Sequence, residues 1–306
     1  MSIFRPAISR PAAFLLSPAF NVGQARRYRL EIDQRRDGVC ALQCVMDVSL
    51  AVRARQEQGW VLDWCIDCCE VLDAQPDMRP LLSALGRFSA GFAMEVLVDA
   101  GGAVLGFVNA DAVQRRMAQN ADQAIEVAQT ERPHDPLLAQ IRSVMSVLVG
   151  NRSVLEHTLL KELRMLLGGL GREYQVGEVE EVQTRVPSMF GTGEVPVLGR
   201  VSVHEARVDK REIELGWLMV IDTQTAGAVM ARELAQLQPA DGRRNPWAAQ
   251  GAMPLYEAAS RLDFDDRATL VIDLDTAWPI RGEHVRRISA GARERLEGVR
   301  WTPLPR

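Results

Sequence analysis

Apolar and polar residues alternate strictly in the first third of the chain. Apolar side chains occupy every even position from 40 to 54, while the odd positions include Gln43, Asp47 and Arg53. A period of two predicts a long strand with one face in solvent. After a turn at 55–59 the even positions stay apolar to Cys68, which predicts an antiparallel hairpin. The expected cross-strand pairs are Ala54–Trp60, Val52–Leu62, Leu50–Trp64, Val48–Ile66 and Met46–Cys68.

The elements around this hairpin follow from the same pattern. Residues 27–33 alternate before the turn dipeptide Asp37-Gly38 and predict a preceding strand. Residues 77–88 have the leucine spacing of a short helix, and 92–108 read as a second hairpin. Three helical stretches are expected between 109 and 168, the last two rich in leucine.

Strands resume after Gly171. Residues 172–221 predict three strands, followed by a helix at 226–238, a loop at 239–254 and a closing strand pair at 266–288. The order of three strands, a helix and two strands therefore occurs twice. We interpret residues 1–24 as an N-terminal arm and 25–306 as one domain, with pseudo-repeats 25–108 and 172–292 around a helical insert at 109–170.

About ten antiparallel strands with one continuous apolar face have to curl or be covered in water. The predicted fold class is α+β: a curved antiparallel sheet, or half-barrel, whose concave face is covered by the leucine-rich helices. Such a shape encloses a cavity suited to apolar ligands. The predicted ligand-binding residues are large inner-face side chains: Met46, Leu50, Trp60, Trp64, Phe92, Met94, Trp217 and Met219.

Three of the five cysteines cluster in the stretch "WCIDCCEV" (64–71). On a regular strand Cys65 and Cys69 point to one face and Cys68 to the other, so their sulfurs do not converge on a metal or form a turn-based dithiol. Cys40, Cys44 and Cys68 are expected to share the apolar face as small hydrophobes. No metal or cofactor is predicted.

Composition narrows the function classes. A net charge of −4 gives no basic field for nucleic acid, and only two of the 36 basic residues are lysines, so arginine clusters carry little weight. The apolar run at 11–20 is superficially similar to a secretory signal, but Pro11 and Pro18 bracket it, no clean cleavage site follows, and it is too short to span a bilayer. An arm packed on the domain is the favoured interpretation, and export is the alternative. Reduced cysteines slightly favour a cytoplasmic over a periplasmic location.

The sequence lacks several common catalytic motifs. The chain has no nucleophile elbow, Walker lysine or zincin motif, and its four histidines are far apart in sequence. The acidic residues flanking one strand could hold a divalent ion or act as acid and base: Asp263, Asp265, Asp266, Asp273 and Asp275. Turn aspartates that accept backbone N–H bonds are the alternative interpretation, and it is the favoured one.

The strand triplets at 26–72 and 172–223, with helices between strand groups, resemble bacterial lipoprotein carriers of the LolA/LolB type. That resemblance implies an antiparallel half-barrel with a helical lid that shields a lipid. The leading hypothesis is a non-catalytic protein that binds a lipid or another apolar ligand. The alternatives are a structural protein that pairs with a partner or with itself through its apolar sheet face, and a metal-dependent enzyme that uses the aspartates.

Overall fold

The computed structural model describes residues 13–133, 135–187, 194–221, 262–290 and 293–305. These residues form an eleven-stranded antiparallel sheet in the order β6-β5-β4-β3-β2-β13-β12-β11-β10-β9-β8. The strands are β2 (Ala25–Arg36), β3 (Val39–Gln56), β4 (Gly59–Ala74), β5 (Phe92–Asp99), β6 (Val104–Phe107), β8 (Val179–Pro187), β9 (Glu194–Arg207), β10 (Glu212–Ile221), β11 (Leu262–Asp273), β12 (Pro279–Ala290) and β13 (Arg293–Pro303).

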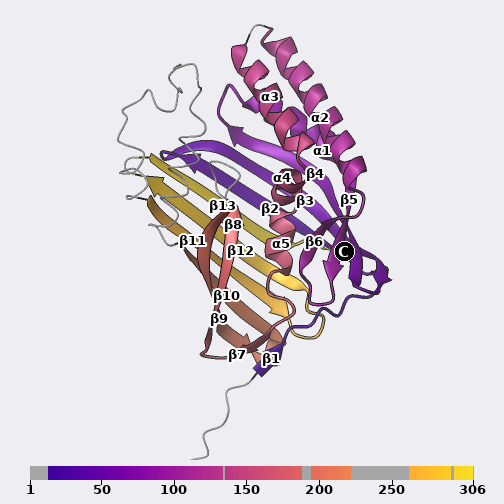
Figure 1. Ribbon diagram of the computed structural model, residues 1–306, viewed down its shortest axis with the longest axis vertical. Helices are drawn as coiled ribbons and strands as arrows, with labels where there is room; N and C mark the ends of the chain where they lie inside the picture. Colours follow the sequence, from indigo (N-terminus) through magenta and orange to yellow (C-terminus); the bar gives the residue numbers. More distant parts are fainter. Residues whose placement is uncertain (1–12, 134, 188–193, 222–261, 291–292, 306) are drawn as a thin grey trace, which may run out of the picture.

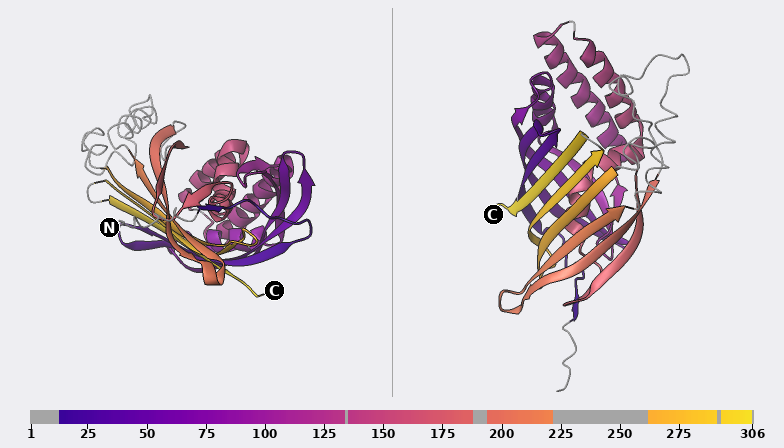
Figure 2. Two further views of the ribbon diagram at one scale, coloured as in Figure 1. Left: turned by 90° about the horizontal axis from the view of Figure 1, so that it is seen from below. Right: turned by 90° about the vertical axis from the view of Figure 1, so that its left-hand side faces the viewer.

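The sheet curves but does not close, and its concave side holds helices (Figure 1; Figure 2). The helices are α1 (Arg79–Ser89), α2 (Ala110–Glu131), α3 (Pro136–Gly150), α4 (Arg152–Leu159) and α5 (Lys161–Leu167), with one 3-10 turn at Val208–Lys210. The predicted α+β half-barrel is therefore confirmed, with eleven strands in the main sheet. The helix expected at 226–238 and the loop at 239–254 lie outside the described residues.

Only part of the helical region covers the sheet. Leu155, Leu160, Leu163, Leu166 and Leu167 of the α4–α5 segment are buried in the main core against the sheet. In contrast, α3 contributes Leu138 to a second, smaller cluster that it shares with α1 and the C-terminal half of α2. The predicted cover at 137–167 therefore comes mainly from α4 and α5, while α3 lies along α2 and reaches the main core with Leu148 near its C-terminal end (Figure 1).

Several element boundaries also differ from the prediction. The third helical stretch is divided at Leu160 into α4 and α5, and the Asn151 side chain accepts a bond from the Val154 N–H to cap α4. The single strand expected after Gly171 is two strands: β7 (Glu173–Gln175) pairs with β1 (Ala13–Leu15), and β8 follows a turn at Gly177. β13 was not predicted.

The long hairpin β3–β4 shows where an alternation pattern stops being reliable. Three of the five predicted pairs are found, namely Val52–Leu62, Leu50–Trp64 and Val48–Ile66. Bulges at both ends shift the register, so that Ala54 lies opposite Val61 and Met46 lies opposite Cys69.

The bulge beyond Val48 also corrects the predicted faces of the cysteines. Cys68 lies opposite Asp47 and is exposed, whereas Cys69 lies opposite Met46 on the inner face. Cys65 pairs with Ser49 on the outer face, so it does not share a face with Cys69 as predicted. The prediction that Cys68 joins Cys44 on the apolar face was wrong, because one inserted residue reverses the side on which each later side chain lies.

Candidate functional site

The eight predicted ligand-binding residues divide into two groups by burial. Leu50, Trp60, Trp64 and Met94 are almost fully buried in the main core. The other four are partly exposed: Met46, Phe92 and Trp217, which pack against that core, and Met219. The first four therefore form the wall of the half-barrel, and only the second group remains accessible to a ligand.

The partly exposed inner face is clearest along β10. Ile213 and Leu215 are fully buried, and the backbone of Gly169, just after α5, lies so close that a Cβ there would meet Leu215 and Ile272 at 2.8 and 2.9 Å. Further along the same face, Trp217 and Met219 are only partly buried. The apolar inner face thus continues beyond the segment that α5 covers.

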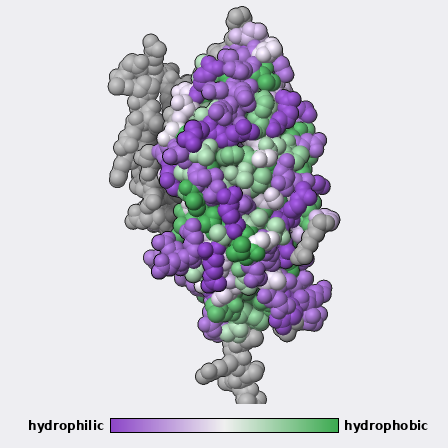
Figure 3. All heavy atoms as spheres, turned by 90° about the vertical axis from the view of Figure 1, so that its right-hand side faces the viewer, coloured by the Kyte–Doolittle hydropathy of each residue, from purple (hydrophilic) through white to green (hydrophobic). Residues whose placement is uncertain are grey.

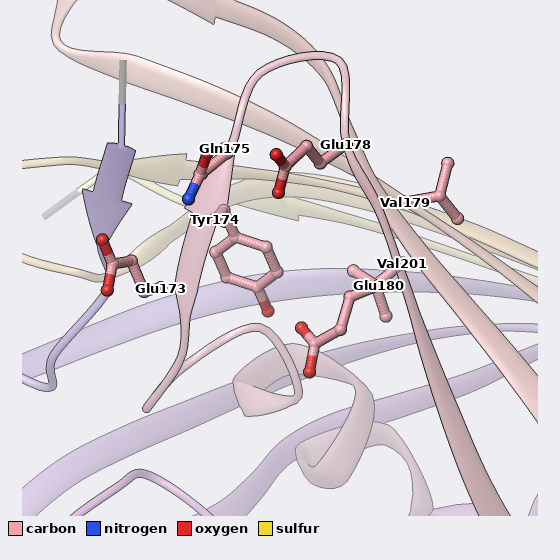
Figure 4. Close-up of a pocket in the computed structure, with 7 residues that line it drawn as sticks. All are labelled: Glu173, Tyr174, Gln175, Glu178, Val179, Glu180 and Val201. Carbon is pink, nitrogen blue, oxygen red and sulfur yellow. The ribbon is translucent and has the colours of Figure 1, made fainter. Parts of the chain in front are cut away.

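A cavity of about 370 Å³ lies between β7, β8 and β9 (Figure 4). Three of its seven lining residues are acidic, namely Glu173, Glu178 and Glu180, and the ring of Tyr174 lies among them. The Tyr174 hydroxyl donates to the carbonyl of Gly169 at 3.1 Å, and burial raises its pKa to about 12. This tyrosine is therefore a structural donor that stays protonated at neutral pH.

A larger cavity of about 720 Å³ lies between the end of β4 and helices α1 and α2. Its volume is in the range of small-molecule sites. Its lining contains both apolar and charged side chains: Cys69, Glu70, Val71, Asp73, Ala74, Pro76, Arg79, Pro80, Ser83, Arg87, Val127 and Glu131. None of the eight predicted ligand-binding residues lines either of these two cavities.

Buried charges cross the inner face beside Met219. Asp266, Arg286 and Glu297 lie directly opposite one another on β11, β12 and β13, and Met219 on β10 lies opposite Asp266. One Asp266 oxygen accepts from His284 Nε2 and the other from Arg286 Nε, each at 2.6 Å. Lys161, the first residue of α5, donates to Glu297. We call Lys161, Asp266, His284, Arg286 and Glu297 the inner-face charged cluster.

The pKa values of the cluster follow from this pairing. Burial opposes ionisation of Asp266, but the hydrogen bond from His284 and the charge of Arg286 outweigh it, so the pKa of Asp266 is lowered. Burial likewise opposes ionisation of Glu297, and Lys161 reverses the effect and lowers its pKa. The neighbouring Glu162 differs, because burial dominates and raises its pKa. The carboxyl groups of Asp266 and Glu297 are thus ionised at neutral pH, and the Lys161–Glu297 contact joins α5 to the sheet.

His284 has one ring nitrogen without an assigned role. The side chain is 2% exposed, and within the described part of the chain Nδ1 has no hydrogen-bond partner. The Asp266–His284 pair has the geometry of a general-base dyad, but neither of the two cavities includes it. The pair therefore links β11 to β12 through side chains as well as through the backbone.

The five aspartates of the predicted acidic site do not converge. Asp263 and Asp265 are paired with Arg287 and Arg267, while Asp275 is paired with Arg211 at the far end of β11. Asp273 accepts the backbone N–H groups of residues 275 and 276 at 2.9 and 2.8 Å, the capping role favoured from the sequence. Asp273 lies seven residues along the strand from Asp266, which is roughly 23 Å.

Among the described residues no group of three or more histidine, cysteine or acidic side chains is placed to hold a metal ion. The three aspartates expected before the strand, Asp263, Asp265 and Asp266, lie within β11 instead. That part of the prediction was wrong because the strand begins earlier than its apolar residues indicate.

The charged cluster was missed by sequence reasoning. Asp266 and His284 are 18 residues apart and meet only through the register of the β11–β12 hairpin. The sequence did contain a signal for it. Asp266, His284 and Arg286 occupy the same alternate positions as the apolar inner-face residues of their strands, so all three are expected on the inner face. Counting across the hairpin turn at 274–278 would have paired them.

Comparison with known proteins adds little to this geometry. No family model matches the chain, and no curated protein matches it. A solved structure described as lipid–protein interactions in lipovitellin is similar over 94% of this chain, with 8% sequence identity and a TM-score of 0.39. The chain spans 25% of the length of that chain. A TM-score this low carries no argument about ligand or function.

Proposed function

We propose that the protein is a non-catalytic binding protein that holds a lipid or another apolar ligand against the inner face of the half-barrel. The observation that supports it most is the row of inner-face side chains on β10 that continues past α5, where Trp217 and Met219 remain partly exposed. Covering a large apolar side chain contributes roughly 1.5–3 kcal/mol. An apolar ligand that covers these residues would therefore gain free energy from surface that the helices leave uncovered.

In the proposed complex the eight predicted residues have two roles. Leu50, Trp60, Trp64 and Met94 form the rigid wall, while Met46, Phe92, Trp217 and Met219 contact the ligand. The resemblance in element order to LolA/LolB-type carriers supports the same kind of ligand.

Native mass spectrometry of gently purified protein tests the proposal. We expect a bound mass of lipid size, or saturable binding of a fluorescent fatty acid when the natural ligand has been lost. The substitution Met219→Asp should abolish binding, because it places a charge on the proposed contact surface. Val220→Asp is the matched control, since Val220 is 40% exposed on the opposite face of the same strand.

Two outcomes would contradict the proposal. One is a wild-type protein that carries no ligand and binds no fatty acid. The other is equal binding by both variants, which would place the ligand away from β10. Circular dichroism of each variant ensures that loss of binding is not loss of fold.

The alternative function, pairing with a partner or a second copy, is supported by a different surface. Leu218, Val220 and Val179 are 39%, 40% and 57% exposed on the outer face of β10 and β8. On the face shown in Figure 3, by contrast, apolar groups are small and interrupted by hydrophilic ones. If the outer group is an interface, Val220→Asp and not Met219→Asp should change the oligomeric state in light scattering. None of the described helices is long and apolar enough to cross a membrane.

A further inference from the structure

Two cysteine thiols from neighbouring strands meet on the inner face. Cys44 on β3 lies opposite Val71, and Cys69 on β4 lies opposite Met46, so the cysteines are diagonal neighbours on one face of the hairpin. Their side chains are hydrogen-bonded to each other, with Cys44 as the donor. The two side chains therefore lie near each other on the inner face of the hairpin.

The two thiols differ in access. Cys44 is only 4% exposed, whereas Cys69 is partly exposed and lines the cavity of about 720 Å³ between β4, α1 and α2. The glycine at position 86 lets α1 approach this sulfur, since a Cβ there would lie 3.1 Å from Cys69 Sγ. A small reactant that enters the cavity meets Cys69 first, with Cys44 directly behind it.

The hydrogen bond also gives the two thiols different pKa values. The bond that Cys44 donates lowers the pKa of Cys69, against the effect of burial, and it raises the pKa of Cys44. The thiolate is the nucleophilic form of cysteine. Cys69 is thus the better nucleophile of the pair, and Cys44 retains its proton.

We propose that Cys69 and Cys44 form a peroxide-sensitive dithiol, in which Cys69 is the attacking thiol and Cys44 the resolving one. The pair is a modification site that goes beyond ligand binding on β10 and does not depend on it. Its location also connects it to the larger cavity, because the disulfide would draw the Cys69 sulfur towards Cys44 and away from α1.

The two steps balance with hydrogen peroxide as the oxidant. The Cys69 thiolate attacks one peroxide oxygen, the O–O bond breaks, and hydroxide leaves as the Cys69 sulfenic acid forms. The Cys44 sulfur then attacks the Cys69 sulfur and displaces its oxygen, which departs as water with the thiol proton. The products are one Cys44–Cys69 disulfide and two waters for each peroxide and two thiols consumed.

If exposure alone decided which cysteine is oxidised first, the first would be Cys68 and not Cys69. Cys68 is the exposed cysteine of the five and lies next to Cys69 in sequence, but on the outer face. The pKa of Cys65 is raised by burial and by Asp67, and that of Cys40 is raised by burial and its hydrogen bond to Asp73. If accessibility governed the reaction, Cys68 would therefore be modified first.

The test uses the reduced full-length protein titrated with hydrogen peroxide, quenched with catalase and alkylated before non-reducing digestion and mass spectrometry. The expected result is a Cys44–Cys69 link that accumulates while Cys68 is still alkylated. Trypsin leaves Cys40 with Cys44 on one peptide and Cys65, Cys68 and Cys69 on another, so tandem fragmentation must assign the link.

Single cysteine-to-serine variants test which two cysteines form the disulfide. Cys68→Ser and Cys40→Ser should leave the linked peptide unchanged, whereas Cys44→Ser should lose it and leave a sulfenic acid on Cys69 that dimedone traps. Oxidation of Cys68 before Cys69, or a link through Cys40 or Cys65, would overturn the proposal. The wild-type titration decides the question even if Cys44→Ser does not fold, because it requires no substitution.

Discussion

Asp266 is the single residue on which the charged cluster depends most. Its carboxylate is 3% exposed and accepts bonds from both His284 and Arg286. Removing one member of a buried ion pair typically costs roughly 3–5 kcal/mol, because the partner charge is left unpaired. We therefore expect Asp266→Asn to lower the free energy of unfolding in urea by about that amount.

The matched control for this substitution is Asp263→Asn, three residues earlier on the same strand. The Asp263 side chain is 63% exposed and its ion pair with Arg287 is in solvent. Exposed pairs contribute about 1 kcal/mol or less. Equal effects of the two substitutions would show that Asp266 is not the anchor of a buried cluster.

The same residue predicts a pH dependence of stability. Because the pKa values of Asp266 and Glu297 are lowered in the folded chain, their contribution is complete above the unfolded value of about 4 and is lost as the pH falls through the folded values. Glu162 acts in the opposite sense, since its raised pKa favours the folded state as the pH falls. Urea titrations across this range should show the difference between wild type and Asp266→Asn narrowing with acid.

A constant difference between the two proteins from neutral to acidic pH would contradict this assignment. Asp263→Asn serves again as the control, and its curve should run parallel to that of the wild type.

At the scale of elements, Gly169 determines how closely α5 approaches the sheet. A Cβ at this position would lie 2.8 Å from Leu215, 2.9 Å from Ile272 and 3.3 Å from Trp217. Overpacking of this kind typically costs about 1–3 kcal/mol. Gly169→Ala should therefore lower the thermal midpoint and increase solvent access to the inner face of β10.

Gly150, at the end of α3, offers the comparison. A Cβ there meets nothing within 4 Å, and the residue is exposed. Gly150→Ala should be neutral or slightly stabilising in the same thermal melt. If Gly169→Ala were equally silent, α5 would not be held against the sheet by this contact.

Elements were predictable from the sequence where apolar periodicity was undisturbed. The central pairs of β3–β4 were found because alternation and turn position agree there, while the bulges at its ends are not encoded in that alternation. β13 was missed for a related reason. Its inner-face positions include the charged residues Arg295 and Glu297. The strand therefore lacks the uninterrupted series of apolar inner-face residues by which the other strands were predicted.

The candidate site was predicted less well than the fold. The inner-face parity of Trp217 and Met219 was visible in the sequence, but their exposure depends on where α5 ends. The Cys44–Cys69 contact and the Asp266–His284 bond both depend on hairpin register, which a search along the chain does not reveal.

At the scale of the whole molecule, the order of strands agrees with the predicted duplication, which stays a prediction. From one edge of the sheet inwards, strands β8 to β12 are neighbours in chain order. Beyond β13, strands β2 to β6 are again neighbours in chain order, up to the other edge. Within the described sheet, β13 connects the two groups of strands, because it pairs with β12 on one side and with β2 on the other. The C-terminal strand thus makes one continuous sheet of the two groups.

This continuity predicts that the described sheet unfolds as one unit. Trp301 of β13 is 2% exposed, lies opposite Leu30 of β2 and covers Gly282 of β12, where a Cβ would meet its ring at 2.4 Å. Trp301→Ala should cost roughly 3–5 kcal/mol. It should also lower the midpoints of unfolding measured by far-UV circular dichroism and by tryptophan fluorescence together.

The neighbouring substitution Arg300→Ala, at a side chain that is 62% exposed on the outer face, should leave both midpoints nearly unchanged. Two separate transitions in Trp301→Ala, with one kept at the wild-type position, would mean that one group of strands stays folded without the other. The half-barrel would then consist of two cooperative units that β13 merely connects. Coincident transitions instead mean that the two strand groups unfold as one cooperative unit, as expected from a sheet and a core that span both groups.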